Sequence, residues 1–162
     1  MKKLFLTAFI ALALSACGGS RHHMTLNDKS GFDTVWEGAE KRLKIVGYER
    51  PFMLFFFTST CGACKEQIPV LNEVSRENGV RVLGVLGDGA GFDRDMDVLC
   101  EKGVSFPTVS DKKSVSYFAN IAGGVMGTPL TLLFDAKGRL AKSFLGFYPR
   151  SAFENALKLA AK

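Results

Sequence analysis

The sequence predicts an α/β domain with a central mixed sheet and helices on both of its faces. An unbroken apolar run at residues 52–58 is typical of a strand buried on both faces. Segments with helical spacing of apolar residues alternate with extended segments along the chain, which indicates crossover connections. An Asp-x-x-Gly turn at residues 135–138 separates two further extended segments, so a hairpin completes the sheet.

Composition limits the class of protein. The chain has 162 residues, 47% of them hydrophobic and 23% charged, with a formal net charge of +5. One domain of this length buries a core without disulfide stapling, and the hydrophobic content excludes a disordered chain. Lys and Arg are interleaved with Asp and Glu, so we expect no nucleic-acid partner.

The first residues have the pattern of a targeting segment. Lys2 and Lys3 precede an apolar stretch that is too short to span a bilayer comfortably, and this stretch ends in Leu-Ser-Ala before Cys17. This resembles a bacterial lipobox, and the alternatives are an ordinary secretory signal or an uncleaved anchor. We therefore expect a signal peptide at residues 1–16 and lipidation of Cys17. The lipid would hold the protein in the periplasm at the inner or outer membrane.

The segments between the leader and the apolar run are predicted in two parts. Residues 17–30 are small and polar and indicate a flexible tether after the lipidated cysteine, with a domain over residues 31–162. His22 and His23 fall in this tether and make poor metal ligands there. Apolar residues at helical spacing predict an amphipathic helix over residues 32–46.

The remaining elements follow from periodicity and from breakers. Helices are expected at residues 65–78, 93–102, 111–121 and 151–161, and extended segments at residues 80–86, 104–109, 130–134 and 139–147. Pro69 should kink the first of these helices and Gly79 should end it. Asp111 is the expected cap of the third helix. Cys100 in the second is expected to pack in the core, and the alternative is a third redox thiol that links to a partner.

Cys61 and Cys64 form a Cys-x-x-Cys pair directly after the apolar strand. Lys65 follows the pair, so a haem attachment signal, which requires His there, is excluded. A zinc site needs two more ligands, and a structural disulfide across two residues closes too small a loop to gain much entropy. A redox dithiol needs its first sulfur at a helix N-terminus, where free N–H groups stabilise a thiolate. The sequence supplies that context, with small Gly62 and Ala63 between the cysteines, and therefore favours the redox interpretation.

At these residues the chain resembles the thioredoxin superfamily, and in particular its membrane-anchored TlpA/ResA-like branch. Three features carry the resemblance over residues 45–162: the Cys-Gly-Ala-Cys-Lys motif, Pro69 five residues after the second cysteine, and Gly127-Thr128-Pro129 before an apolar strand. The resemblance implies a thioredoxin-like three-layer sandwich in which Pro129 follows a cis peptide bond and lies against the cysteines.

The resemblance also implies a mechanism and partners. Cys61 would exchange with a protein disulfide through a mixed disulfide, Cys64 would resolve it, and the backbone of Thr128 would pair with the partner chain. We expect a monomeric extracytoplasmic reductase without cofactor or metal, reduced in turn by a membrane electron donor. A disulfide isomerase or oxidase using the same cysteines is the alternative.

The sequence departs from the family at three positions. Thr60 stands where relatives commonly have Trp, Phe55 where thioredoxins carry a buried Asp, and Gln67 where TlpA-like reductases often carry Glu. No buried carboxylate is then evident to move the proton of Cys64. We expect Gln67 to hold a water at that place.

Two other functions fit part of the pattern. Thr58 and Cys61 match the Thr-x-x-Cys part of a peroxiredoxin motif, but Leu54 stands where that motif has proline. The two thiolates could instead bind copper(I) in a metallochaperone. Copper-delivery relatives usually have three residues between the cysteines and a later histidine, and this chain has neither.

Overall fold

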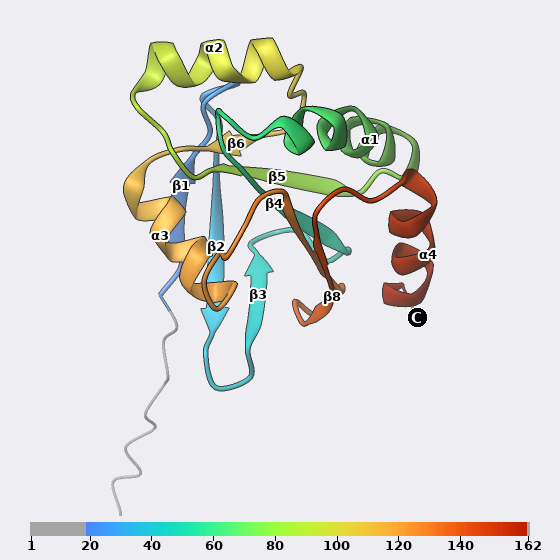
Figure 1. Cartoon of the computed structure of the whole chain (residues 1–162). Helices are drawn as coiled ribbons and strands as arrows, with labels where there is room; N and C mark the ends of the chain where they lie inside the picture. The colour runs from blue at the N-terminus through green and yellow to red at the C-terminus, as the bar shows by residue number, and fades with distance from the viewer. Residues whose placement is uncertain (1–18, 162) are drawn as a thin grey trace, which may run out of the picture.

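The larger of two sheets forms the centre of the molecule (Figure 1). The structure is a computed structural model that describes residues 19–161, so the expected signal peptide and Cys17 lie outside the described residues. The central strands are β4 (Phe52–Phe57), β5 (Arg81–Leu86), β6 (Thr108–Val109), β7 (Leu130–Phe134) and β8 (Leu140–Leu145). Their order is β6-β5-β4-β7-β8. Because β4 is parallel to β5 and antiparallel to β7, the sheet is mixed, as predicted.

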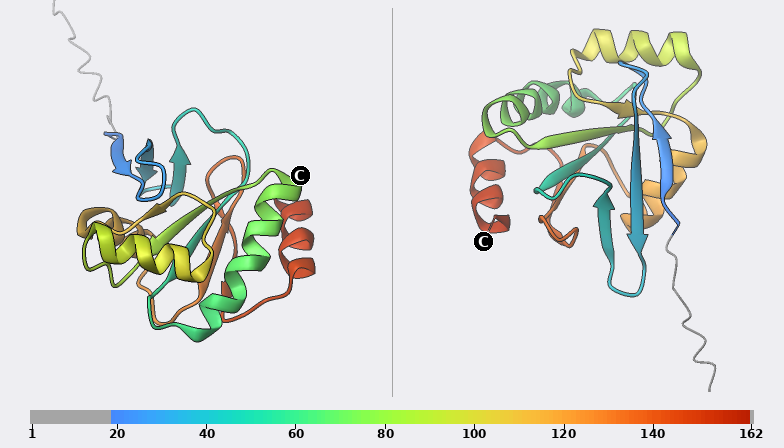
Figure 2. Two further views of the ribbon diagram at one scale, coloured as in Figure 1. Left: turned by 90° about the horizontal axis from the view of Figure 1, so that it is seen from above. Right: turned by 180° about the vertical axis from the view of Figure 1, so that it is seen from behind.

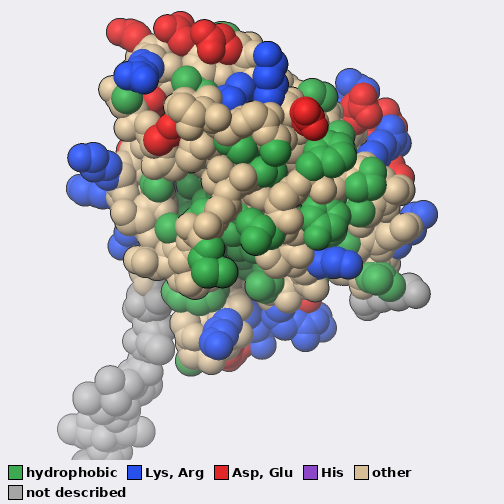
Figure 3. All heavy atoms as spheres, in the orientation of Figure 1, with side chains coloured by type: hydrophobic (Ala, Val, Ile, Leu, Met, Phe, Trp, Pro, Cys, Tyr) green, Lys and Arg blue, Asp and Glu red, His purple; other side chains and the backbone are tan. Residues whose placement is uncertain are grey.

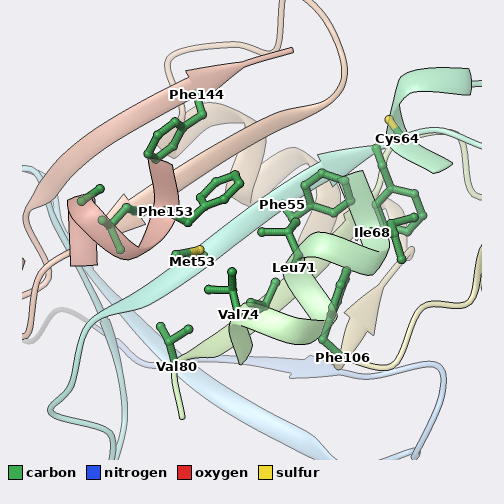
Figure 4. Packing of buried hydrophobic residues seen from close by; sticks show 14 of the residues in the cluster. Met53, Phe55, Cys64, Ile68, Leu71, Val74, Val80, Phe106, Phe144 and Phe153 are labelled. Atoms are coloured by element: carbon green, nitrogen blue, oxygen red, sulfur yellow. The ribbon is translucent and has the colours of Figure 1, made fainter. Parts of the chain in front are cut away.

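Strand β4 is buried on both faces, and its side chains alternate between two hydrophobic clusters. Met53, Phe55 and Phe57 join the cluster that includes α1 (Gly62–Asn78) and α4 (Arg150–Ala160) (Figure 4). The side chains in between point to the other cluster, which includes α3 (Lys112–Ile121). The helices therefore cover both faces of the sheet, which confirms the predicted three-layer architecture.

The predicted elements around this core are largely confirmed. Asp111 caps α3 through a hydrogen bond from the Ser114 N–H to its carboxylate, and Gly79 ends α1 in the left-handed conformation at φ 60°. Helix α1 continues through Pro69 and begins three residues earlier than expected. The extended segment expected at residues 104–109 is a strand only at Thr108–Val109.

The helix predicted at residues 32–46 is wrong, because the structure forms a hairpin there. Strands β2 (Gly31–Glu37) and β3 (Arg42–Ile45) pair antiparallel across a turn that contains Lys41 at φ 50°. Leu43 and Ile45 are buried in the cluster beside α3 while Lys44 between them is exposed. This alternation is the two-residue period of a strand, and tertiary burial of that face overrides the helical spacing.

The flexible tether was predicted to reach residue 30, but the ordered domain begins before that residue. Strand β1 (Arg21–Met24) pairs with β2 and lies beside α3, in Figure 1 and in the view from behind in Figure 2. His23 is fully buried, and its ring nitrogens are 2.8 Å from Ser114 Oγ and 2.9 Å from Thr34 Oγ1. The histidine expected in a mobile tether therefore fastens the smaller sheet to α3.

Helix α2 (Phe92–Lys102) overturns a third prediction. Leu99 is buried under it, whereas Cys100 is exposed, so Cys100 is not a core residue. Adjacent residues on a helix point about 100° apart, and Leu99 is the one that faces the sheet. Within residues 19–161, no helix combines the length and the apolar character that crossing a membrane requires.

The burial of His23 predicts a pH dependence of stability. Burial lowers the pKa of His23 from 6.5 to about 4, against the opposing charge of Asp111, while Arg21 adds to the lowering. The unfolded chain therefore takes up a proton between pH 6.5 and 4 that the folded chain does not. The free energy of unfolding should therefore keep its full value above about pH 6.5 and fall by about 3 kcal/mol as the pH approaches 4.

Urea denaturation of the wild type, His23→Gln and His22→Gln between pH 7.5 and 4.5 tests this expectation. The His23→Gln variant should be less stable at pH 7.5 and should lose much of the slope with pH. His22 is the matched control, because it is the exposed neighbour on the same strand. Equal slopes for the wild type and His23→Gln would contradict the assignment.

Candidate active site

Cys61 and Cys64 lie at the start of α1 and are joined by a disulfide. Cys61 is the N-cap, and its Sγ accepts the Cys64 N–H at 3.1 Å. Cys61 is half-buried, whereas Cys64 is fully buried against Ile68 and the aromatic side chains of β4 (Figure 4). One sulfur is thus open to a partner at a helix N-terminus while the other is held behind it.

The loop before Cys61 is fixed by a carboxylate that sequence reasoning missed. Asp88, just after β5, accepts hydrogen bonds from the Ser59 N–H at 2.9 Å and from the Ser59 hydroxyl at 2.5 Å. The Cys61 N–H donates to the Thr58 carbonyl at 3.3 Å, and Thr60 between them is exposed. The signal for Asp88 was its place at the carboxyl end of the strand parallel to β4, which brings it to the same edge of the sheet.

The Thr128–Pro129 peptide bond is cis, as the resemblance implied. Pro129 is buried, and its carbonyl accepts the Gly146 N–H at 2.8 Å, which anchors this loop to the chain after β8. A hollow of about 470 Å³ is lined both by Thr128 and by Thr58 of the cysteine loop. The predicted substrate-binding residues Gly127 and Thr128 therefore border the same hollow as the loop that leads to Cys61.

Gln67 is fully buried and contacts protein backbone. Its Oε1 accepts the Tyr148 N–H at 2.7 Å, and its Nε2 donates to the Tyr148 carbonyl at 3.1 Å. The side chain that was expected to hold a water instead fastens the segment between β8 and α4 to α1. Phe55 is buried beside Phe57 with stacked rings, so an aromatic ring fills the place of the thioredoxin carboxylate.

The remaining predicted site residues lie on the exposed surface of α1. Gly62, Ala63 and Pro69 are exposed on α1, and a side chain added at Gly62 would meet no other atom within 4 Å. Lys102, which the sequence did not single out, donates to the Cys61 carbonyl at 3.2 Å from the end of α2. Across residues 19–161, no three His, Cys, Asp or Glu side chains converge on a point where a metal ion could bind.

An open sulfur at a helix N-terminus with a buried sulfur behind it suits exchange with a partner disulfide. With the cis-proline loop on this sheet, the arrangement defines a thioredoxin-like thiol–disulfide oxidoreductase. The Redoxin family model matches residues 37–158, and the chain belongs to the Redoxin family.

Solved structures support the fold. A thiol:disulfide interchange protein of the thioredoxin family from Chlorobium tepidum superposes with a TM-score of 0.66 at 19% identity, covering 87% of this chain and 92% of that one. A putative thiol:disulfide interchange protein DsbE from the same organism gives 0.65 at 22% identity, with coverages of 88% and 94%. The exposed lipoprotein thioredoxin Etrx1 of Streptococcus pneumoniae gives 0.64 at 22% identity, with coverages of 87% and 99%. No curated protein matches the chain by sequence.

The contacts of Gln67 predict the outcome of Gln67→Glu. A carboxylate keeps the acceptor for the Tyr148 N–H but loses the donor to the Tyr148 carbonyl. The variant should therefore lose about 1–3 kcal/mol of stability at pH 8. Protonation restores the donor, so the loss relative to wild type should shrink at pH 5.

Urea denaturation at the two pH values measures this difference. Glu66→Gln, an exposed change on the same turn of α1, serves as control and should leave stability nearly unchanged. A Gln67→Glu deficit that is the same at both pH values would contradict the role of the donor.

Proposed function

We propose that this protein reduces protein disulfides outside the cytoplasm, through Cys61 and Cys64. The observation that carries the proposal is the asymmetry of the pair: Cys61 is half-exposed at the N-terminus of α1, and Cys64 is fully buried. Exchange needs an accessible attacking thiolate and a resolving thiol that the substrate does not reach.

The reaction follows from these two positions. The Cys61 thiolate attacks one sulfur of the substrate disulfide, a Cys61–substrate bond forms, and the other substrate sulfur leaves as a thiolate. The Cys64 sulfur, after losing its proton, attacks Cys61 and releases the second substrate thiolate. The product is the Cys61–Cys64 disulfide seen in the structure, so two electrons have passed to the substrate.

The loop at Gly127 and Thr128 is the proposed docking strip for the substrate chain. It borders the hollow of about 470 Å³ shared with Thr58, and the neighbouring residue Met126 is 96% exposed. An extended substrate segment can pair with the backbone of Thr128 while its apolar side chains cover Met126.

The proposed location rests on the leader at residues 1–16 and on Cys17. One structural neighbour is an exposed lipoprotein thioredoxin, which agrees with this proposal. A lipid on Cys17 would hold the domain at the inner or outer membrane. A membrane electron donor of the thiol-reductase type would then return the disulfide to the dithiol.

Trapping of the mixed disulfide tests the two roles. With Cys64→Ser, Cys61 should keep a glutathione adduct after treatment with oxidised glutathione, whereas Cys61→Ser should not accumulate one, because Cys64 is buried. Mass spectrometry detects the adduct. All proteins carry Cys17→Ser and Cys100→Ser and lack residues 1–16, because the exposed Cys100 would add glutathione by itself. An adduct on Cys64 in the Cys61→Ser variant would contradict the assignment.

The direction of exchange is tested by the equilibrium between the Cys61–Cys64 pair and glutathione. A reductase should have a reduction potential near that of thioredoxin, about −270 mV. A value near about −120 mV would make the protein a disulfide donor and favour the oxidase alternative.

A separate assay tests the peroxidase alternative. Consumption of hydrogen peroxide faster than reduction of a disulfide substrate would favour a peroxidase.

A further inference from the structure

Lys102 brings a positive charge to the cysteine pair from another helix. Its ammonium donates to the Cys61 carbonyl oxygen at 3.2 Å, and the side chain is partly buried. Only four covalent bonds separate that oxygen from Sγ of the same residue, so the ammonium lies within about 8 Å of the Cys61 sulfur. This separation does not exceed the Debye length of roughly 8 Å at physiological ionic strength, so salt screens the interaction only in part.

The position of Lys102 is fixed by a clamp between α1 and the end of α2. Gly103 ends α2 in the left-handed conformation at φ 67°. The Asn72 amide of α1 donates to the Gly103 carbonyl at 2.7 Å, and its Oδ1 accepts from the Ser105 hydroxyl at 2.7 Å and from the Ser105 N–H at 3.2 Å. One side chain of α1, the helix capped by Cys61, therefore holds the residues on the C-terminal side of Lys102 against that helix.

The other charged side chains near the cysteines do not provide a positive charge that could attract a Cys61 thiolate. Asp88 is hydrogen-bonded to Ser59, two residues before Cys61, so its charge opposes a thiolate there. Lys65 and Glu66 are exposed neighbours on α1 with opposite charges. The outer surface of α2 is acidic, and carboxylates gather at the top of Figure 3. Among residues 19–161, Lys102 is the cation that donates a hydrogen bond to the cysteine loop.

We propose that Lys102 is a positioning residue that stabilises the Cys61 thiolate and, with it, the reduced form of the pair. It orders the Cys61 backbone through the carbonyl and places a fixed charge beside the sulfur, at a site where Phe55 replaces a carboxylate. The attraction favours the thiolate over the thiol and over the neutral disulfide. This inference rests on the proposed function, because it takes Cys61 to be the attacking thiol.

Removal of the charge should make Cys61 less reactive. In Lys102→Met, the rate of attack on a disulfide probe at pH 6 should fall about three- to thirty-fold, as expected for a unit charge at this distance. The equilibrium constant for forming the disulfide against glutathione should rise within the same range. The midpoint of the thiolate absorbance at 240 nm should move to higher pH. All three measurements use the reduced chain with Cys17→Ser and Cys100→Ser.

Three further variants separate charge from structure. Lys102→Arg keeps a cationic donor and should restore most of the wild-type behaviour. Lys158→Met is the matched control, because it removes a lysine from the last turn of another helix, α4. Asn72→Ala keeps Lys102 but loosens the clamp, so its effect should be in the same direction as that of Lys102→Met and smaller.

The outcomes are distinguishable from failure of the proposed function. One outcome is that the wild type exchanges with the probe while Lys102→Met has the same thiolate midpoint and the same rate as the wild type. In that case the inference is wrong and the proposed function stands. An equal change in Lys102→Met and Lys158→Met would also overturn it, since the effect would then follow net charge. If the wild-type pair forms no reversible disulfide, the proposed function itself fails.

Discussion

Packing of α1 against β4 determines where the cysteines lie. Cys64, Ile68 and Leu71 are fully buried on the face of α1 that contacts the aromatic side chains of β4. Since the helix cannot slide along this face without exposing them, its first turn is fixed over the end of the strand. Cys64 is both the first buried residue of α1 and the inner sulfur of the pair, so the same packing that stabilises the helix withdraws this sulfur from solvent.

Elements with one dominant signal were predictable from the sequence. The apolar run predicted β4, and the cysteine motif predicted a helix after it, although α1 begins three residues earlier than expected. The Thr-Pro pair before β7 predicted the loop with the cis peptide bond. These signals are local, because each depends on a few adjacent residues and not on what packs against them. The cap at Asp111 and the end of α1 at Gly79 belong to the same group.

The errors have a common physical cause, which is burial by distant parts of the chain. The hairpin of β2 and β3 has apolar residues that also fit a helical spacing, and only contact with α3 selects the strand. His23 is in a short polar segment, and no local pattern shows that Ser114 and Thr34 satisfy both ring nitrogens. Gln67 and Lys102 share this limitation: their partners, Tyr148 and the Cys61 carbonyl, are 81 and 41 residues away.

Two kinds of side chain surround the cysteine pair: a neutral amide on the buried side and charged groups on the exposed side. Gln67 lies on the buried side of the cysteine pair, and both of its polar atoms hydrogen-bond to the backbone of Tyr148. It therefore makes the site more rigid and adds no charge. Asp88 and Lys102 lie on the exposed side and act on the residues just before and at Cys61 with opposite charges. In the proposed reaction, a partner disulfide that approaches Cys61 from the exposed side would meet these two opposite charges first. Under the same proposal, the packing of the buried side keeps Cys64 in place while Cys61 reacts.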